Sequence, residues 1–291
     1  IVACSSNNEI IPVPDVDPDG DDGTTEVEFA KGADIGWVTE YESKGYNFYN
    51  AKGEQRECTA LMKELGLNAI RIRVWVDPSK HGNWCNTADV VEKAKRAKEL
   101  GMDVMIDFHY SDWWADPAQQ NKPASWVGKN LANLKSAIKD HTVSVLQALK
   151  TIGVIPKWVQ VGNEIRPGML WDEDVALSGA SYNVTEKDLK DAPASATDKV
   201  VYPMNWANLG AFVTTGYDAV KSVFPDAIVI VHLDNGWDSG LFTWFFDELK
   251  KNGGKWDMIG MSLYPYWSRD AKEGYSSADA VITDCISTVS Y

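Results

Sequence analysis

Residues 87–109, TADVVEKAKRAKELGMDVMIDFH, contain the pattern that decides the fold prediction. Over 87–100 the apolar residues recur at helical spacing, and the following Gly101 is typical of the left-handed turn that ends a helix. Residues 102–109 then form a short, mostly apolar run of the kind found in buried strands. Because the same unit recurs along the chain, the sequence predicts a parallel sheet with helices packed against it.

The alternation of strands and helices extends from about residue 29 to the end of the chain. The predicted strands are 29–36, 68–76, 102–109, 157–163, 227–233 and 256–264. The predicted helices are 54–66, 87–100, 129–151, 205–223, 240–251 and 275–290. No linker interrupts this pattern after residue 30, so we predict a single α/β domain over residues 29–291.

Two parallel architectures compete for this pattern, an open doubly wound sheet and a (β/α)8 barrel. A doubly wound nucleotide-binding protein should carry the spacing G-x-G-x-x-G after an early strand, and no strand here is followed by it. The strand ends instead carry Arg, His, Asp, Trp, Glu and Tyr, and the rim formed by such ends holds the active site of barrel enzymes. We therefore predict a (β/α)8 TIM barrel of which about six βα units are present.

The charge of the chain is concentrated near its start. The 291 residues carry a formal net charge of −14, and residues 1–30 contain eight acidic residues and no basic one. Nucleic-acid binding is excluded as a function class because phosphate contacts require clustered Lys and Arg. No run of the chain approaches the roughly 18 consecutive apolar residues that a membrane-spanning helix requires.

The first six residues, IVACSS, resemble the site at which bacterial lipoproteins are cleaved and then lipidated on cysteine. We interpret residues 1–28 as a lipoprotein-like N-terminus with Cys4 as the lipidation site, followed by an acidic disordered linker. This predicts a secreted, lipid-anchored protein on the bacterial cell surface or outer membrane, touching the membrane only through its lipid. The alternative is a chance cysteine near a disordered terminus.

Four acidic residues of the linker, Asp15, Asp17, Asp19 and Glu26, match the spacing of a calcium-binding EF-hand loop. Three prolines at positions 12, 14 and 18 prevent the entering helix that such a loop requires. A solvated acidic linker is the favoured interpretation, and calcium stays a weak possibility. No organic cofactor is expected.

Tryptophan suggests the class of ligand. Seven of the thirteen tryptophans fall at or just after the end of a predicted strand: Trp37, Trp75, Trp113, Trp114, Trp171, Trp237 and Trp267. Indole rings gathered on one rim offer flat apolar platforms for the C–H faces of sugars. We expect a carbohydrate cleft, and an aromatic-lined peptide groove is the competing interpretation.

The candidate chemistry lies in VGNE, residues 161–164, at the end of the fourth predicted strand. A carboxyl group at a strand end suits general acid catalysis on a glycosidic oxygen. The neighbouring Asn163 could bind the sugar 2-hydroxyl, a contact that strengthens in the transition state. An Asn-Glu pair alone is weak evidence, and its place in the strand pattern makes Glu164 the candidate acid.

Five segments at successive strands carry a more specific resemblance. They are RIRVWVDP (71–78), DFHYSDWWADP (107–117), VQVGNEIRPGMLW (159–171), HLDNGW (232–237) and IGMSLYPYW (259–267). Together they resemble glycoside hydrolase family 53, the endo-β-1,4-galactanases, which are retaining barrel enzymes. The resemblance implies a β-1,4-galactan or galactooligosaccharide substrate, including the galactan side chains of pectin, and we expect a monomer.

The resemblance also implies roles for individual residues. Glu164 corresponds to the acid/base, Asn163 to its 2-hydroxyl partner, Arg73 to the residue that braces the nucleophile, and Tyr264 to a hydrogen-bond donor to it. Arg71 points to the same side as Arg73 by the strand period of two. The active-site and subsite residues implied are His109, Asp112, Trp113, Trp171, His232, Asp234, Trp237 and Trp267. For Asp112 and Asp234, an equal alternative is that the carboxylates simply order their loops.

The family's nucleophile, a Glu at the end of the seventh strand, has no counterpart in this sequence. The one Glu after the sixth predicted strand, Glu273, lies in a polar loop and is not assigned the role. We therefore expect a chain that stops before strand seven, lacking roughly two βα units. The alternatives are a surface glycan-binding lipoprotein without catalysis, and a related barrel hydrolase of β-1,4-mannan or glucan.

Overall fold

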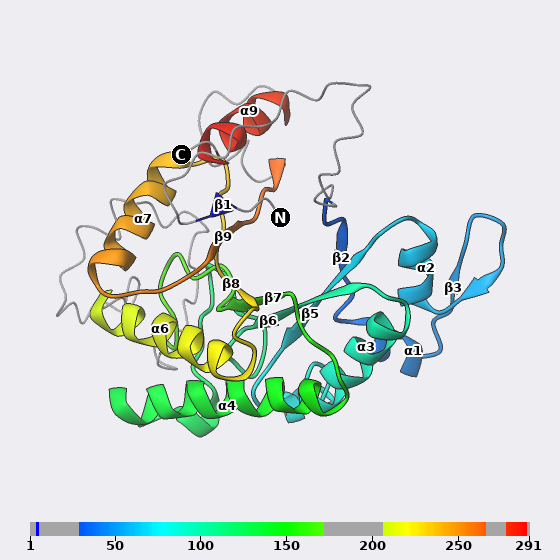
Figure 1. Cartoon of the computed structure of the whole chain (residues 1–291), viewed down its shortest axis with the longest axis horizontal. Helices are drawn as coiled ribbons and strands as arrows, with labels where there is room; N and C mark the ends of the chain where they lie inside the picture. Colours follow the sequence, from blue (N-terminus) through cyan, green and yellow to red (C-terminus); the bar gives the residue numbers. More distant parts are fainter. Residues whose placement is uncertain (1–3, 6–28, 172–205, 266–277, 290–291) are drawn as a thin grey trace.

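The computed structural model describes residues 4–5, 29–171, 206–265 and 278–289. Among them, six parallel strands form one curved sheet in the order β2-β5-β6-β7-β8-β9 (Figure 1). A short strand β1 (Cys4–Ser5) pairs antiparallel with β9. The six strands are β2 (Gly32–Asp34), β5 (Ala69–Val74), β6 (Asp103–Phe108), β7 (Trp158–Val161), β8 (Ile228–Leu233) and β9 (Met258–Met261).

Six longer helices correspond to the six helical segments that the periodicity predicts, each with ends that differ by a few residues at most. They are α2 (Cys58–Glu64), α3 (Thr87–Glu99), α4 (Leu131–Thr151), α6 (Trp206–Val223), α7 (Ser239–Lys251) and α9 (Ala278–Val289). Figure 1 shows α3, α4, α6 and α7 along the outer side of the curved sheet. This arrangement is a half-barrel of the (β/α)8 type, and it confirms the predicted fold class.

The two faces of each strand have different chemistry. In β5, Ile70, Ile72 and Val74 are fully buried members of the main apolar core, as are Ile106 and Phe108 in β6. Successive side chains of a strand point to opposite faces. The residues between them, which include two arginines in β5 and an aspartate in β6, therefore line the inner side of the half-barrel.

A small insertion between β2 and α2 was missed by the sequence prediction. It contains α1 (Val38–Ser43) and the hairpin of β3 (Phe48–Tyr49) and β4 (Gln55–Arg56). The predicted helix 54–66 begins only at Cys58, because Glu57 caps it by accepting a hydrogen bond from the Ala60 amide at 2.9 Å. Residues 54–57 belong to the hairpin and its exit.

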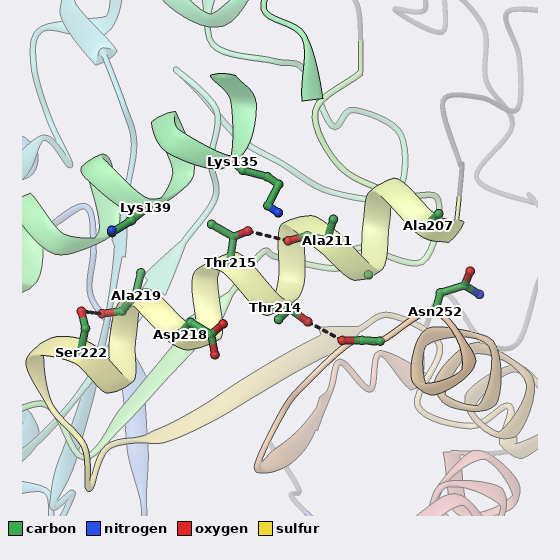
Figure 2. A pocket seen from close by; sticks show the side chains of 12 residues that line it. Lys135, Lys139, Ala207, Ala211, Thr214, Thr215, Asp218, Ala219, Ser222 and Asn252 are labelled. Atoms are coloured by element: carbon green, nitrogen blue, oxygen red, sulfur yellow. Dashed lines mark hydrogen bonds between the residues drawn. The ribbon is translucent and has the colours of Figure 1, made fainter. Parts of the chain in front are cut away.

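A groove lies in the helix layer between α4 and α6 (Figure 2). Lys135 and Lys139 of α4 line one side, and Thr214 and Asp218 of α6 line the other. Its lining comes from α4, α6 and the turn after α7 (Asn252 and Gly253), so it is distinct from the strand ends that carry the candidate chemistry. Within the described part of the chain, no helix combines the length and apolarity needed to cross a bilayer.

Candidate active site

Glu164 lies on a tight turn directly after β7. Gly162 has a φ of +81°, and a Cβ there would approach Ile165 Cγ2 to 2.5 Å, so only glycine fits. Glu164 itself has a φ of +49°, a left-handed conformation that is uncommon for a residue with a side chain. Such backbone strain is tolerated where surrounding contacts hold it, and it is frequent at functional sites.

The contacts that hold this turn come from two neighbouring segments. The Glu164 amide donates to His232 Nδ1 at 3.3 Å, and the Ile165 amide donates to the His232 carbonyl at 3.1 Å. The buried side chain of Gln120 donates to the carbonyl oxygen of Asn163 at 2.8 Å. The carboxyl group of Glu164 is therefore presented from a backbone fixed by β8 and by the segment between β6 and α4.

Asn163 is oriented by partners at both ends of its amide. Its Oδ1 accepts a hydrogen bond from Arg71 Nη2 at 2.9 Å, and its Nδ2 donates to the Ala115 carbonyl at 2.7 Å. Only 8% of the residue is exposed. The second hydrogen of Nδ2 is thus the one that could bind a sugar hydroxyl beside Glu164.

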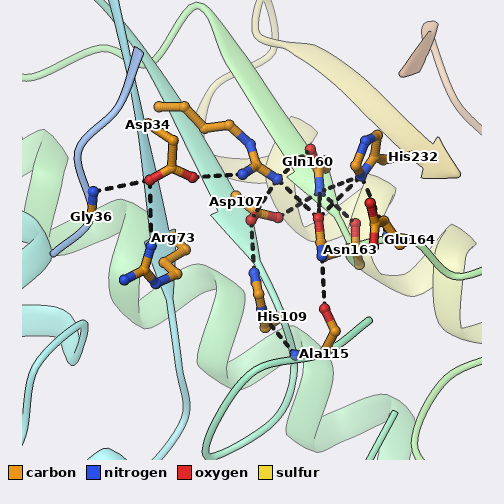
Figure 3. A network of polar contacts seen from close by, with 12 residues as sticks. Asp34, Gly36, Arg73, Asp107, His109, Ala115, Gln160, Asn163, Glu164 and His232 are labelled. Carbon is orange, nitrogen blue, oxygen red and sulfur yellow. Dashed lines mark hydrogen bonds and ion pairs between the residues drawn. The ribbon is translucent and has the colours of Figure 1, made fainter. Parts of the chain in front are cut away.

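A buried ionic layer lies beneath Asn163 (Figure 3). Arg71 pairs with Asp34 at 2.7 Å and with the fully buried Asp107 at 2.8 Å. Asp107 also accepts hydrogen bonds from Gln160 Nε2 at 2.6 Å and contacts His109 Nε2 at 2.9 Å. Burial would raise the pKa of Asp107, but Arg71 and His109 lower it, so the carboxylate stays ionised.

The two arginines of β5 have different roles. Both lie on the inner face, as the strand period predicts, and the resemblance assigned the bracing role to Arg73. In the structure Arg71 contacts Asn163 directly. Arg73 instead lies over the ring of Trp114 at 4.2 Å and reaches Asp34 at 3.4 Å.

The electrostatics around Glu164 favour its protonated form. Burial raises its pKa to about 7, with further upward contributions from Asp234 and Asp116, against the lowering effects of the Ser262 hydrogen bond and of Arg71. The Ser262 hydroxyl donates to Glu164 Oε1 at 2.6 Å. A carboxyl group that titrates near neutral pH can both give and take a proton, which general acid–base catalysis requires.

Both predicted active-site histidines are buried within this network. His109 uses both ring nitrogens, contacting Asp107 through Nε2 and accepting from the Ala115 amide at 2.9 Å through Nδ1. His232 lies between Asn163, at 3.1 Å, and Ser262, at 3.0 Å. Burial and the nearby Arg71 lower the pKa of His232 to about 3, so its ring is neutral.

The two aspartates left open by the sequence have ordering roles in the structure. Asp112 accepts hydrogen bonds from the amides of Asp77 and Ala124, both at 2.9 Å, and so fixes the loops after β5 and β6. Asp234 forms a bidentate pair with the buried Arg166 at 2.7 and 2.8 Å. A direct sugar contact by either carboxylate stays a prediction.

The rim tryptophans within the described residues differ in exposure, and Trp37 is partly buried against the main core. Trp113 and Trp114 are 36% and 38% exposed, and His81 stacks on the Trp113 ring at 3.7 Å. Trp75, Trp171 and Trp237 are buried, so in this structure they support the rim and offer no open platform. These three strand-end positions pack the loops above the sheet, and the predicted sugar contacts of Trp171 and Trp237 stay predictions.

The remaining predicted residues are only partly placed. Tyr264 follows β9 and is 57% exposed, and its role toward a nucleophile stays a prediction. Trp267, the linker acids Asp15, Asp17, Asp19 and Glu26, and Glu273 lie outside the described residues. The backbone of Cys4 belongs to β1, and its lipidation stays a prediction. The part of the chain that the structure describes contains no cluster of three or more residues suited to hold a metal ion.

Sequence reasoning missed several members of the network, notably Asp34, Asp107, Gln160 and Ser262. Asp107 and Gln160 carried a usable signal, because each is a polar residue flanked on both sides by apolar residues of its strand, at DVMIDF and WVQV. Their facing register, Asp107 opposite Gln160, follows from the parallel pairing of β6 and β7. Ser262 carried none, since a serine after a strand is common in loops.

A curved parallel sheet with a strained, protonatable glutamate beside an oriented asparagine at one strand end defines the class of (β/α)8-barrel glycoside hydrolases. Residues 30–288 match the model of glycosyl hydrolase family 53, and the chain belongs to that family. This confirms the resemblance carried by the five sequence segments.

Known proteins agree with this assignment. An arabinogalactan endo-β-1,4-galactanase of Thermothelomyces thermophilus is 34% identical over 247 residues, which are 83% of this chain and 65% of that relative's length. A structure from a study of two fungal β-1,4-galactanases superposes with a TM-score of 0.70 at 32% identity, covering 89% of this chain and 68% of that one. The family 53 catalytic domain of Ignisphaera aggregans superposes with a TM-score of 0.67 at 32% identity, covering 84% of this chain and 62% of that one.

Proposed function

We propose that the protein hydrolyses β-1,4-galactan internally, with Glu164 as the general acid and base. The observation that carries the proposal is the environment of Glu164, whose pKa is raised to about 7 chiefly by burial. At that pKa the group is protonated often enough to donate to a departing sugar oxygen, and ionised often enough to activate water afterwards. The galactanase relatives support galactan as the substrate class.

The reaction is proposed to be a double displacement with retention of configuration. In the first step Glu164 protonates the glycosidic oxygen while a carboxylate attacks the anomeric carbon, and Asn163 binds the 2-hydroxyl. In the second step ionised Glu164 takes a proton from water, which displaces the enzyme carboxylate. Glu164 ends the cycle protonated, because the proton that it gives to the leaving group is replaced by one taken from water.

Double displacement requires a second carboxylate about 5–5.5 Å from Glu164. Among the described residues, the carboxylates of Asp234 and Asp116 raise the pKa of Glu164 through their charge. Asp234 is bound by Arg166, and Asp116 accepts from the Ala118 amide at 2.8 Å and the Gln119 side chain at 2.9 Å. We therefore propose that the nucleophile comes from residues outside the described part of the protein.

The sugar platforms of the proposed cleft are Trp113 and Trp114. They lie in the loop after β6, and Trp114 approaches Arg73, which shares the inner face with Arg71. Their exposed rings and the nearby amide of Asn163 combine apolar faces with hydrogen-bond donors, as sugar recognition requires. The galactan side chains of pectin are the proposed natural substrate.

A panel of polysaccharides tests the proposed function. We expect purified protein in a form that contains the proposed nucleophile to release short galactooligosaccharides from β-1,4-galactan and at least about 100-fold less product from β-1,4-mannan or β-1,4-glucan, a ratio that polar recognition readily supplies. Chromatography of the products distinguishes internal cleavage from release of single sugars, and proton NMR of the first products reports the anomeric configuration. Preferred cleavage of mannan or glucan would contradict the substrate, and tight galactan binding without any product would favour a glycan-binding protein.

A further inference from the structure

Ser262 lies at a junction that none of the sequence motifs assigned. It follows β9 directly, and its Oγ is 2.6 Å from Glu164 Oε1 and 3.0 Å from His232 Nε2. Its backbone is fixed as well, because its amide donates to the Leu233 carbonyl at 2.9 Å and its carbonyl accepts from the Gly236 amide at 2.8 Å. The hydroxyl is therefore held between the catalytic carboxyl group and a buried imidazole.

The hydrogen positions in this junction follow from the partners of His232. A neutral imidazole carries one N–H, on either Nδ1 or Nε2. The backbone amide of Glu164 can only donate and points its hydrogen at Nδ1, at 3.3 Å, so Nδ1 accepts this bond, while Asn163 Oδ1, 3.1 Å from Nδ1, accepts from Arg71. With Nδ1 as the acceptor for the Glu164 amide, the ring proton belongs on Nε2 and donates to Ser262 Oγ. The single hydroxyl proton of Ser262 is then directed at Glu164 Oε1.

We propose that Ser262 is a positioning residue that, held by His232, keeps Oε1 of Glu164 occupied as a hydrogen-bond acceptor and so leaves Oε2 as the oxygen that carries and delivers the catalytic proton. This inference deepens the proposed function, since it takes Glu164 as the acid and base. No bond to carbon changes in the junction. One proton is gained or lost at Oε2, while the hydroxyl and imidazole protons keep their places.

The groups that face Glu164 come from every element around it. Asp234 after β8 and Asp116 in the segment before α4 are the acidic ones, Arg71 of β5 is the basic one, and Ser262 after β9 is the neutral donor. Asp234 and Asp116 disfavour the ionised form of Glu164, whereas the Ser262 hydroxyl and Arg71 favour it. Because removal of the hydroxyl takes away a donor to the carboxylate, the proposal predicts that Glu164 will hold its proton to higher pH in Ser262→Ala.

Carboxyl ¹³C NMR titration of the whole chain tests this without any need for catalysis. Glu164→Gln identifies the Glu164 resonance by its loss. The titration midpoint of Glu164 should rise by about one pH unit in Ser262→Ala, as expected for loss of one hydrogen bond to a charged group, and stay at the wild-type value in Ser262→Thr, which keeps the hydroxyl. An unchanged midpoint in Ser262→Ala, or an equal rise in Ser262→Thr, would overturn the proposal.

The tautomer of His232 is a second readout, and it needs no variant at position 262. The four histidines of the chain can be separated by ¹⁵N NMR, with His232 identified by its loss in His232→Asn. At pH 8 the ring should carry its proton on Nε2, and a proton on Nδ1 would contradict the assigned chain of donors. If Ser262→Ala shifts the midpoint while no galactan is cleaved, the positioning role stands and the proposed function fails. If the midpoint does not shift in Ser262→Ala while the wild type cleaves galactan, the positioning role fails and the proposed function stands.

Discussion

Glu164→Gln is expected to lower the turnover of β-1,4-galactan by about 10²–10⁴-fold, the usual contribution of a general acid and base. Glutamine has nearly the same shape, and its carbonyl oxygen can still accept the hydrogen bond that the Ser262 hydroxyl donates to Oε1. What it lacks is a proton that can be transferred. Reducing-sugar assays measure the loss, and chemical unfolding should show a free energy within about 0.5 kcal/mol of the wild type, as for substitutions that disturb no packing.

Two comparisons separate this effect from a general loss of activity. Glu99→Gln changes an exposed glutamate of α3 by the same chemistry and should leave turnover unchanged. An aryl β-galactoside with a good leaving group needs little protonation, so Glu164→Gln should retain far more of the first step on it than on galactan. Turnover of galactan within twofold of the wild type would remove Glu164 from the acid/base role.

Arg71→Leu is expected to lower the free energy of unfolding by about 3–5 kcal/mol, because breaking a buried ion pair leaves its partner charged and unpaired. The partner here is Asp107, which is fully buried and whose carboxylate is 2.8 Å from Arg71 Nη2. The same change frees Asn163 Oδ1 from its 2.9 Å donor, so the amide beside Glu164 loses one of the contacts that orient it and keeps the bond to the Ala115 carbonyl. Urea unfolding, followed by fluorescence, measures the stability.

Arg73→Leu is the matched control for this prediction, since it removes a buried arginine from the same face of the same strand. Among the described residues Arg73 forms an ion pair only with Asp34, at 3.4 Å, and Asp34 keeps Arg71 as a closer partner. The expected loss is therefore smaller, about 1–2 kcal/mol from the ring contacts and one weak pair. Equal losses of unfolding free energy in the two variants would mean that the pair of Arg71 and Asp107 does not stabilise the buried ionic layer. The same conclusion would follow if the effects of Arg71→Leu and Asp107→Asn on the unfolding free energy simply added in the double variant.

The fold was predictable from the sequence because its signals are local and repeated. Short apolar runs between amphipathic segments located all six parallel strands, and glycine turns such as Gly101 marked the helix ends. The hairpin before α2 was not predictable in this way. Its strands contain two residues each, too few for a periodic pattern, and Glu57 shortens the following helix through a cap that only the folded backbone reveals.

The central residues of the candidate site could be predicted from the sequence, whereas the contacts that orient them could not. Glu164 and Asn163 follow from their place at a strand end and from the family resemblance. The choice between Arg71 and Arg73 depends on which side chain reaches Asn163, and period two puts both on one face. The burial of Trp171 likewise depends on loop packing, since its indole donates to the Pro167 carbonyl at 3.0 Å. Contacts between distant segments decide such details, and a single sequence does not contain them.

The pH dependence of kcat/KM on β-1,4-galactan tests the central claim, that Glu164 acts as the proton donor, most directly. A general acid works in its protonated form, so activity should fall as the pH rises through the pKa of Glu164, which is about 7. The basic limb of the profile is therefore predicted near neutral pH. Activity that stays constant or rises from pH 7 to pH 9 would mean that ionised Glu164 supports the first step, and would contradict the account.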